Sequence, residues 1–301
     1  MGMADLTNFN EEMKRRVAEI CDIIDGYLPQ EEGFQHTVLE AMNYSMRNGG
    51  KKLRPLLMQQ TYAMFGGRSP AIRPFMAAIE MIHTHSLIHD DLPALDNDRY
   101  RRGKETVHVV YGEAMAILAG DALLNYAYET AAQGFELDPG NPDVARAFSV
   151  LARKTGINGM LGGQSVDVEA AGKPLELEPI LFIYRMKTSA LIEASMMAGA
   201  ILAGASAQET EKIRQIAQLV GLAFQIQDDI LDVTGNEAEL GKPVHSDEAN
   251  QKTTYVTRKG LEQSRADVMH YSDEAIALLD SLPYENPFLR ELILRLVSRE
   301  S

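Results

Sequence analysis

The chain has 301 residues, of which 45% are hydrophobic and one, Cys21, is a cysteine. A chain of this length and apolar content can bury a large core, which excludes a disordered protein, and a lone cysteine excludes a framework of internal disulfides. The 29 Lys and Arg residues against 43 Asp and Glu residues give a formal net charge of −14, which disfavours general binding of nucleic acid. Because a single cysteine suits a reducing compartment, we expect a cytoplasmic protein.

No targeting or membrane-spanning segment is expected. The first residues lack the basic and then apolar pattern of a signal peptide. The most apolar stretch, 194–207, is about 14 residues long, which is too short to cross a hydrocarbon layer of about 30 Å. We therefore predict a buried helix there.

Taken in chain order, apolar spacing predicts helices along nearly the whole sequence. Residues 17–28 and 289–297 carry apolar side chains at i, i+3, i+4 and i+7, which indicates two amphipathic helices. Only Val107–Val110 is a candidate for a short strand. Since no low-complexity linker interrupts the chain, residues 1–301 are predicted to form a single all-α domain. The further helices are expected around 35–47, 74–92, 113–132, 143–160, 177–204, 208–232 and 257–282.

Two apolar helical segments each end in paired aspartates. The first acidic cluster is Asp90, Asp91 and Asp96, and the second is Asp228, Asp229 and Asp232. In the second, positions 228 and 232 lie one turn apart and point the same way, so their like charges require a cation. In the first, Pro93 ends the helix near the pair, so Asp96 would reach back from a turn. Carboxylate oxygens favour a hard ion such as Mg²⁺, and two such clusters predict facing helices that share several metal ions.

Several metal ions between acidic helices suit a polyphosphate ligand, and basic residues near the clusters predict a site for a second anionic group. Phosphate oxygens would complete the octahedral shells that carboxylates leave open. Gly49 and Gly50 precede a basic turn in which Lys51 and Arg54 would share a helical face. Each basic residue alone is also typical of a solvated surface. The remaining candidates are Arg101 and Arg102 in a loop, Lys187 next to Thr188 within a helix, and Lys242 and Lys252 around a loop after the second cluster.

Six motifs, in this order, resemble those of the trans-isoprenyl diphosphate synthases. They are Gly49-Gly50-Lys51-xx-Arg54, Ser86-Leu87-Ile88-His89-Asp90-Asp91-xxxx-Asp96, Arg101-Arg102-Gly103, Gly163-Gln164-xx-Asp167, Lys187-Thr188 and Phe224-Gln225-xx-Asp228-Asp229-xx-Asp232. The resemblance runs from about residue 8 to the end, and the four residues between Asp91 and Asp96 are similar to those of bacterial farnesyl diphosphate synthases and related geranylgeranyl enzymes. It implies an all-α homodimer, a helical bundle around a deep central cavity, and a mechanism of ionisation, condensation and elimination.

The resemblance also implies a role for each motif residue. Both acidic clusters, with Asp228 supported by Asp229 and Asp232, would hold three Mg²⁺ ions, or Mn²⁺, on the allylic diphosphate. The departing diphosphate would remove the final proton, so no protein general base is expected. The allylic diphosphate would also contact Arg101, Lys187 and Lys242, with Lys252 near them. Isopentenyl diphosphate would contact Lys51, Arg54, His83 and Arg102, and the allylic cation would be stabilised by Thr188 and Gln225.

One departure from the family pattern bears on product length. His85 lies five residues before Asp90, where farnesyl synthases usually carry Tyr or Phe facing the growing chain. A large residue there stops elongation, at a cost of about 0.8 kcal/mol for each methylene that loses its buried place. His is intermediate in size, so we expect a C15 product, farnesyl diphosphate, with C20 as the competitor. The other departures, Arg99, Glu105 and His245, remove no expected ligand.

Other classes of protein share parts of this pattern. A metal-dependent phosphohydrolase could use His83, His85 and His89 with Asp90, but it needs a further upstream His, and residues 1–82 contain only His36. We expect His89 to be a core residue or one that supports a ligand.

A class I terpene cyclase would share the fold and the first acidic cluster. It typically has Asn and Ser or Thr in place of Asp228 and Asp232, and it has no use for Lys51 and Arg54. A non-catalytic subunit of a heteromeric synthase would lack the aspartates.

Overall fold

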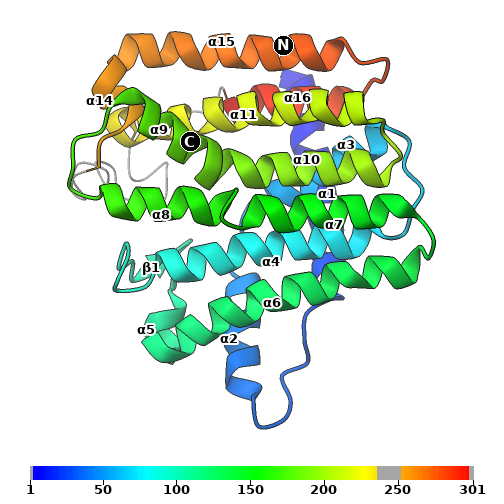
Figure 1. The fold of residues 1–301 in the computed structure, drawn as a ribbon, viewed down its shortest axis with the longest axis vertical. Helices are drawn as coiled ribbons and strands as arrows, with labels where there is room; N and C mark the ends of the chain where they lie inside the picture. Colours follow the sequence, from blue (N-terminus) through cyan, green and yellow to red (C-terminus); the bar gives the residue numbers. More distant parts are fainter. Residues whose placement is uncertain (1–2, 236–251, 298–301) are drawn as a thin grey trace. The chain divides into compact units, whose positions relative to one another are not determined.

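The structure is a computed structural model that describes residues 3–235 and 252–297, of which 75% are helical (Figure 1). Strands occur in the described residues only as β1 (Tyr100–Arg101) and β2 (Lys104–Glu105), which pair antiparallel. The prediction of an all-α fold is confirmed. The helices are α1 (Met3–Asp25), α2 (His36–Met46), α3 (Leu53–Met64), α4 (Ile72–Asp90), α5 (Val107–Tyr111), α6 (Glu113–Leu137), α7 (Pro142–Thr155), α8 (Met160–Ala170), α9 (Leu177–Ile183), the π-helix η1 (Tyr184–Ser189), α10 (Ala190–Leu202), α11 (Ala207–Thr234), α14 (Tyr255–Lys259), α15 (Leu261–Asp280) and α16 (Pro287–Val297).

The chain divides into two compact units. The first unit contains Met1–Gln59 and Arg68–Phe148, and the second contains Gln60–Gly67 and Ser149–Ser301. Each unit therefore carries one of the acidic clusters. The expectation of a single domain over residues 1–301 stays a prediction, as does the deep central cavity.

The first unit is built on the contact between α4 and α6. Phe75, Ile79 and Ile82 of α4 are fully buried. Small residues on α6 allow the two helices to approach closely, since a Cβ atom at Gly134 would lie 3.0 Å from the Phe75 ring. This packing places the C-terminal end of α4, and with it the first acidic cluster, on a rigid support.

In the second unit, α11 packs against α10, α15, α16 and η1. A capping box between Ser206 and Glu209 begins α11, and its buried face includes Leu222, Ala223 and Ile226. α10 is buried along nearly its whole length, as its apolar sequence predicts. No described helix is long and apolar enough to cross a membrane.

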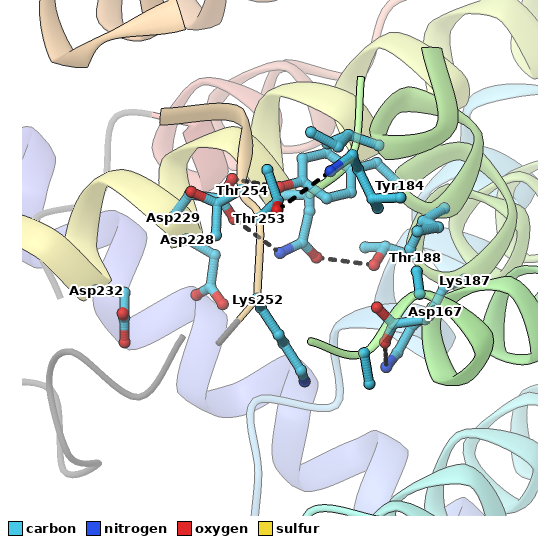
Figure 2. Close-up of a pocket in the computed structure, with 16 residues that line it drawn as sticks. Asp167, Tyr184, Lys187, Thr188, Asp228, Asp229, Asp232, Lys252, Thr253 and Thr254 are labelled. Atoms are coloured by element: carbon cyan, nitrogen blue, oxygen red, sulfur yellow. Dashed lines mark hydrogen bonds and ion pairs between the residues drawn. The ribbon is translucent and has the colours of Figure 1, made fainter. Parts of the chain in front are cut away.

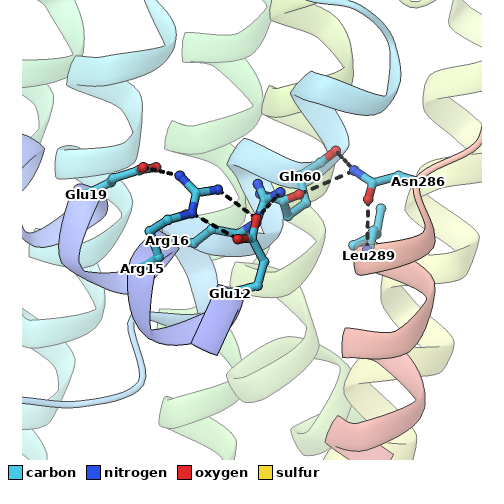
Figure 3. Close-up of polar contacts among 7 residues, drawn as sticks. All are labelled: Glu12, Arg15, Arg16, Glu19, Gln60, Asn286 and Leu289. Atoms are coloured by element: carbon cyan, nitrogen blue, oxygen red, sulfur yellow. Dashed lines mark hydrogen bonds and ion pairs between the residues drawn. The ribbon is translucent and has the colours of Figure 1, made fainter. Parts of the chain in front are cut away.

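Each unit also has local polar contacts that anchor a helix (Figure 3). On α1 of the first unit, Arg15 pairs with Glu12 and Glu19 one turn away on either side. In the second unit, Asn286 donates from Nδ2 to the Gln60 carbonyl oxygen at 2.9 Å. Asn286 also accepts a hydrogen bond of 2.9 Å from the Leu289 backbone N–H, which begins α16. Of these contacts the exposed pairs on α1 contribute least, because solvent screens them.

Two predicted elements differ from the structure. The helix predicted over 17–28 is present within α1 but ends at Asp25. Val107–Val110 is not a strand: it lies in the helical turn α5, which packs against α6 and ends at Gly112 with φ of 84°. The β-branched residues there indicated a strand, but tertiary contacts decided the conformation.

Two helices, α3 and α8, were not predicted. In α3, Pro55 lies in the first turn. The N–H groups of a first turn have no partner within the helix, so the missing N–H of proline costs nothing there. In α8, the segment contains Gly162 and Gly163 and has no apolar stripe, so periodicity could not detect it. The helix predicted over 177–204 is present, but η1 interrupts its α-helical hydrogen bonding.

The π-helix η1 lies between two glycines from neighbouring helices. A Cβ atom at Gly163 of α8 would lie 2.2 Å from the Lys187 backbone nitrogen, and one at Gly221 of α11 would lie 2.3 Å from Ser189 Oγ. Only glycine therefore permits α8 to contact the η1 backbone. π-Helical turns are frequent where side chains must be presented for function.

We predict that Gly163→Ala destabilises the protein by about 1–3 kcal/mol, because the added methyl group meets backbone atoms that cannot move without displacing η1. The free energy of unfolding in denaturant measures this. As a control, a Cβ atom at Gly156 would lie 3.4 Å from the Ala152 carbonyl oxygen, so Gly156→Ala should have little effect. Equal effects of the two substitutions would contradict the close contact.

Candidate functional site

The first acidic cluster lies where α4 ends. Asp90 is the last residue of the helix, and the Asp96 backbone N–H donates to the Asp90 carbonyl oxygen at 2.9 Å. Asp96 is thus carried on a turn that folds back to the helix end, as predicted from Pro93. Carboxylates at a helix C-terminus face the negative end of the helix dipole, so the cluster favours a cation.

Arg101 holds one member of this cluster. Its Nε donates to both oxygens of Asp91, at 2.7 and 3.0 Å, and its Nη2 lies 3.2 Å from Asp98 Oδ2. Asp91 is 5% exposed. Burial raises the pKa of Asp91, and the hydrogen bonds from Arg101 oppose that rise. Asp91 is therefore already paired, whereas Asp96 is exposed.

The hairpin turn between β1 and β2 directs Arg101 and Arg102 to different partners. Arg102 and Gly103 join β1 to β2 with φ of 54° and 77°, the positive values that a type I′ turn requires. Arg101 contacts Asp91, while Arg102 donates from Nη1 to the Gly49 carbonyl oxygen at 2.8 Å. A Cβ atom at Gly50 would lie 2.3 Å from this guanidinium, so the glycine pair allows its close approach.

A buried ion pair lies beside this turn. Lys52 is 6% exposed, and its Nζ lies 3.1 Å from Oε1 of Glu80, which is 2% exposed. Lys52 Nζ also donates to the Met46 carbonyl oxygen at 3.1 Å. The expectation that Lys51 and Arg54 share a helical face was wrong, because α3 begins at Leu53 and the exposed Lys51 precedes it.

Glu80 is surrounded by more positive than negative charge. Burial lowers the pKa of Arg54 to about 10, and Glu80 opposes this shift. Arg102 is coupled to Glu80 in the same way. The pKa of His83 falls well below its usual range because of burial and the nearby Arg54, Arg102 and Lys52, so its ring is neutral. Lys52, Arg54 and Arg102 thus place three positive charges near the single carboxylate of Glu80, which suits the binding of an anion. The buried Arg54 Nε has no hydrogen-bond partner among the described residues.

His85 and His89 both contact α6. His85 is 3% exposed, and its Nδ1 lies 3.0 Å from the Gly120 carbonyl oxygen. Burial lowers the pKa of His85 to about 4, so the neutral ring donates this hydrogen bond. His89 packs edge-on against His85 and has Nε2 3.2 Å from the Ile117 carbonyl oxygen. His89 thus packs on α6 but is only partly buried, so it is not a core residue, and the expectation that it supports a ligand stays a prediction.

The second acidic cluster lines a pocket of about 190 Å³ in the second unit (Figure 2). Its walls come from α8, α9, η1, α11 and the segment that leads into α14. Carboxylates and ammonium groups share this small space, which suits a metal ion together with an anion. The polar residues that line it are Asp167, Tyr184, Lys187, Thr188, Gln225, Asp228, Asp229, Asp232, Lys252, Thr253 and Thr254.

Hydrogen bonds order the side chains of this pocket. Lys187 Nζ donates to Asp167 Oδ2 at 2.7 Å. Thr188 Oγ1 donates to Gln225 Oε1 at 2.8 Å, and Gln225 Nε2 donates to Asp229 Oδ1 at 3.3 Å. Two residues of η1 are therefore oriented by partners on α8 and α11.

Comparison with known proteins places the chain in a family. The polyprenyl synthetase family model matches residues 35–278. The chain belongs to the polyprenyl synthetase family. It is a trans-prenyl diphosphate synthase, a prenyltransferase, and members of this family use a divalent metal ion. The resemblance seen in the sequence is thereby confirmed, and the phosphohydrolase and terpene cyclase alternatives are not supported.

Its relatives differ in their products. The chain is 45% identical over 259 residues to a farnesyl diphosphate synthase of Geobacillus stearothermophilus, covering 85% of this chain and 84% of that protein. It is 39% identical over 287 residues to a geranylgeranyl diphosphate synthase of Cyanophora paradoxa, covering 91% and 95%. A crystal structure of an FPP/GFPP synthase from Zymomonas mobilis matches with a TM-score of 0.85 and 34% identity, covering 97% and 99%.

A second solved relative was crystallised with ligands. The geranyltransferase of Helicobacter pylori complexed with magnesium and isoprenyl diphosphate matches with a TM-score of 0.82 and 31% identity, covering 99% of this chain and 97% of that one.

The carboxylates of this polyprenyl synthetase suit magnesium that is bound together with phosphate. No group of three or more Asp, Glu, His or Cys side chains in residues 3–235 and 252–297 is arranged to hold a metal ion. Mg²⁺ typically keeps waters and binds through one or two carboxylates plus substrate phosphates. The donor chemistry therefore fits, and the assignment of the six aspartates to metal stays a prediction.

The structure groups the expected site residues by unit. In the first unit, Arg101 contacts the first acidic cluster, while Arg54, His83 and Arg102 gather near Glu80. In the second, the pocket brings together the second cluster and the other residues expected there, Lys187, Thr188, Gln225 and Lys252. Lys242 and His245 lie outside the described residues.

Several residues of these sites were missed in the sequence. Lys52 and Glu80 are far apart in sequence, and the one available signal was an acidic residue within the apolar run of α4. Tyr184 and Thr254 line the pocket without belonging to any motif.

We predict that Glu80→Gln lowers the free energy of unfolding by about 3–5 kcal/mol, because Lys52 would be left buried without its counter-charge. Denaturant unfolding measures the change. The control is Glu12→Gln, which breaks surface ion pairs with Arg15 and Arg16 and should leave stability nearly unchanged. A loss at Glu80 no larger than at Glu12 would show that the buried pair does not stabilise the fold.

Proposed function

We propose that the protein joins isopentenyl diphosphate to dimethylallyl and then geranyl diphosphate, and releases farnesyl diphosphate, C15. The observation that carries this proposal is the pocket of the second unit, where Asp228 and Asp232 share a small space with Lys187 and Lys252. Carboxylates that bind a metal and amines that bind phosphate oxygens are together what a leaving diphosphate needs.

Negative charge develops on the leaving diphosphate during ionisation. Mg²⁺, when bound, would stabilise that charge, with three ions per active site. We assign its ligands to the first acidic cluster and to Asp228 of the second, with Asp229 and Asp232 in support. Arg101, Lys187 and Lys252 would hold the diphosphate oxygens through charge-assisted hydrogen bonds. Because these interactions strengthen as the bond breaks, they lower the barrier rather than only binding the substrate.

The allylic cation needs oxygen dipoles and no water. Thr188 donates its proton to Gln225, so the lone pairs of its hydroxyl oxygen can face the cation. Isopentenyl diphosphate would bind the cations around Glu80, through Arg54, His83 and Arg102, with Lys51 at the exposed edge. The released diphosphate removes the final proton, which requires no protein base. We also propose a cytoplasmic homodimer.

His85 supports a C15 product. Its ring is neutral and buried against α6, so it can border an apolar chain without a desolvation penalty for charge. It is smaller than the Tyr or Phe expected in farnesyl synthases, which makes a C20 product the competing proposal, in keeping with the geranylgeranyl synthase among the relatives.

We predict that the enzyme, given dimethylallyl diphosphate, excess isopentenyl diphosphate and Mg²⁺, makes mainly C15 product, as sized by chromatography and mass spectrometry. The variant His85→Ala should shift the product toward C20, because a smaller side chain leaves room for another isoprene unit. A dominant C20 product of the unchanged enzyme would refute the C15 assignment. Hydrolysis of either substrate alone, without condensation, would refute the proposed reaction.

A further inference from the structure

Asp229 of the second acidic cluster accepts hydrogen bonds from three protein donors. It is 3% exposed. The Tyr184 hydroxyl donates to Oδ2, and so does the Tyr255 backbone N–H, at 3.1 Å. Gln225 Nε2 donates to Oδ1 at 3.3 Å. Figure 2 shows dashed contacts at the Asp229 carboxylate, and the Asp228 carboxylate lies apart from them.

These contacts fix the orientation of the Gln225 amide. A carboxylate accepts hydrogen bonds and cannot donate, so it must face the amide NH₂ and not the amide oxygen. Gln225 Oε1 is then turned to Thr188, whose hydroxyl donates to it at 2.8 Å. Reversing the amide would set its oxygen against the carboxylate. Through Gln225, Asp229 therefore fixes the direction in which the Thr188 hydroxyl donates its hydrogen bond.

Asp229 also anchors the chain that returns to the pocket. Tyr255 is the first residue of α14 and is 2% exposed. Its N–H bonds both Asp229 and the Tyr184 hydroxyl, each at 3.1 Å. The residues just before it, from Lys252 to Thr254, line the pocket. One carboxylate therefore links α11, η1 and the segment that carries Lys252.

We propose that Asp229 is a positioning residue and not a metal ligand: it orients Gln225 and Thr188 toward the allylic cation and holds the segment of Lys252 at the pocket. This inference rests on the proposed prenyltransferase function. A carboxylate that accepts three hydrogen bonds from the protein is held in place by them and has at most one lone-pair site left for a metal ion.

The test compares Asp229→Asn with Asp228→Asn. Binding of Mn²⁺ in the presence of inorganic diphosphate, followed by calorimetry, should weaken by about tenfold or more in Asp228→Asn and stay near the unchanged protein in Asp229→Asn. Turnover of Asp229→Asn should fall about 10–100-fold, because an Asn cannot accept from both Gln225 and the two other donors. Hydrogen exchange over residues 252–259 should quicken in Asp229→Asn and stay unchanged in Asp228→Asn.

A second, milder variant tests the proposal in case Asp229→Asn does not fold. Tyr184→Phe removes one donor and keeps the carboxylate, so it should lower turnover less than Asp229→Asn, quicken the same hydrogen exchange, and leave Mn²⁺ binding unchanged. Loss of Mn²⁺ binding in Asp229→Asn equal to that in Asp228→Asn would overturn the proposal, as would full turnover of Asp229→Asn. The binding and exchange measurements need no turnover, so a failure of the unchanged enzyme to make product would count against the proposed function alone.

Discussion

Carboxylates near the carboxyl ends of two helices impose the electrostatic constraint on which the sites depend. α4 ends at Asp90, and α11 ends six residues after Asp228, so each cluster adds negative charge close to carbonyl groups that already carry a partial negative charge. The protein offsets part of this charge itself, through Arg101 on Asp91 and through three donors on Asp229. Under the proposed function, the remaining negative charge attracts divalent metal ions, and these in turn attract the diphosphate.

The basic group in the first unit follows the same principle with the signs reversed. Lys52, Arg54 and Arg102 outnumber Glu80. The burial of Lys52, and of an Arg54 Nε that has no hydrogen-bond partner among the described residues, makes this imbalance costly until an anion binds. Glu80 pairs with Lys52, and the proposed function assigns Arg54 and Arg102 to isopentenyl diphosphate. Under that proposal the enzyme distinguishes its two diphosphates by chemistry: one binds through metal ions on carboxylates, and the other binds guanidinium groups directly.

Local sequence signals predicted the features that depend on neighbouring residues. Apolar spacing followed by Pro93 was sufficient to place the end of α4 and the turn that carries Asp96. Features that depend on distant residues were not predictable. The conformation of η1 relies on Gly163 and Gly221 from other helices, and Lys52 finds Glu80 through tertiary packing. Val107–Tyr111 is helical against its β-branched composition because it packs on α6.

The most direct test of the joint action of both acidic clusters is a double-mutant comparison of turnover. Asp90→Ala and Asp228→Ala should each lower turnover by about a thousandfold or more while thermal unfolding stays cooperative, because each removes support for the leaving diphosphate. The double variant should be no slower than the worse single variant, since groups that act as one unit lose their effect together. A loss of about tenfold or less in either single variant, or losses that multiply in the double variant, would contradict joint action on one diphosphate.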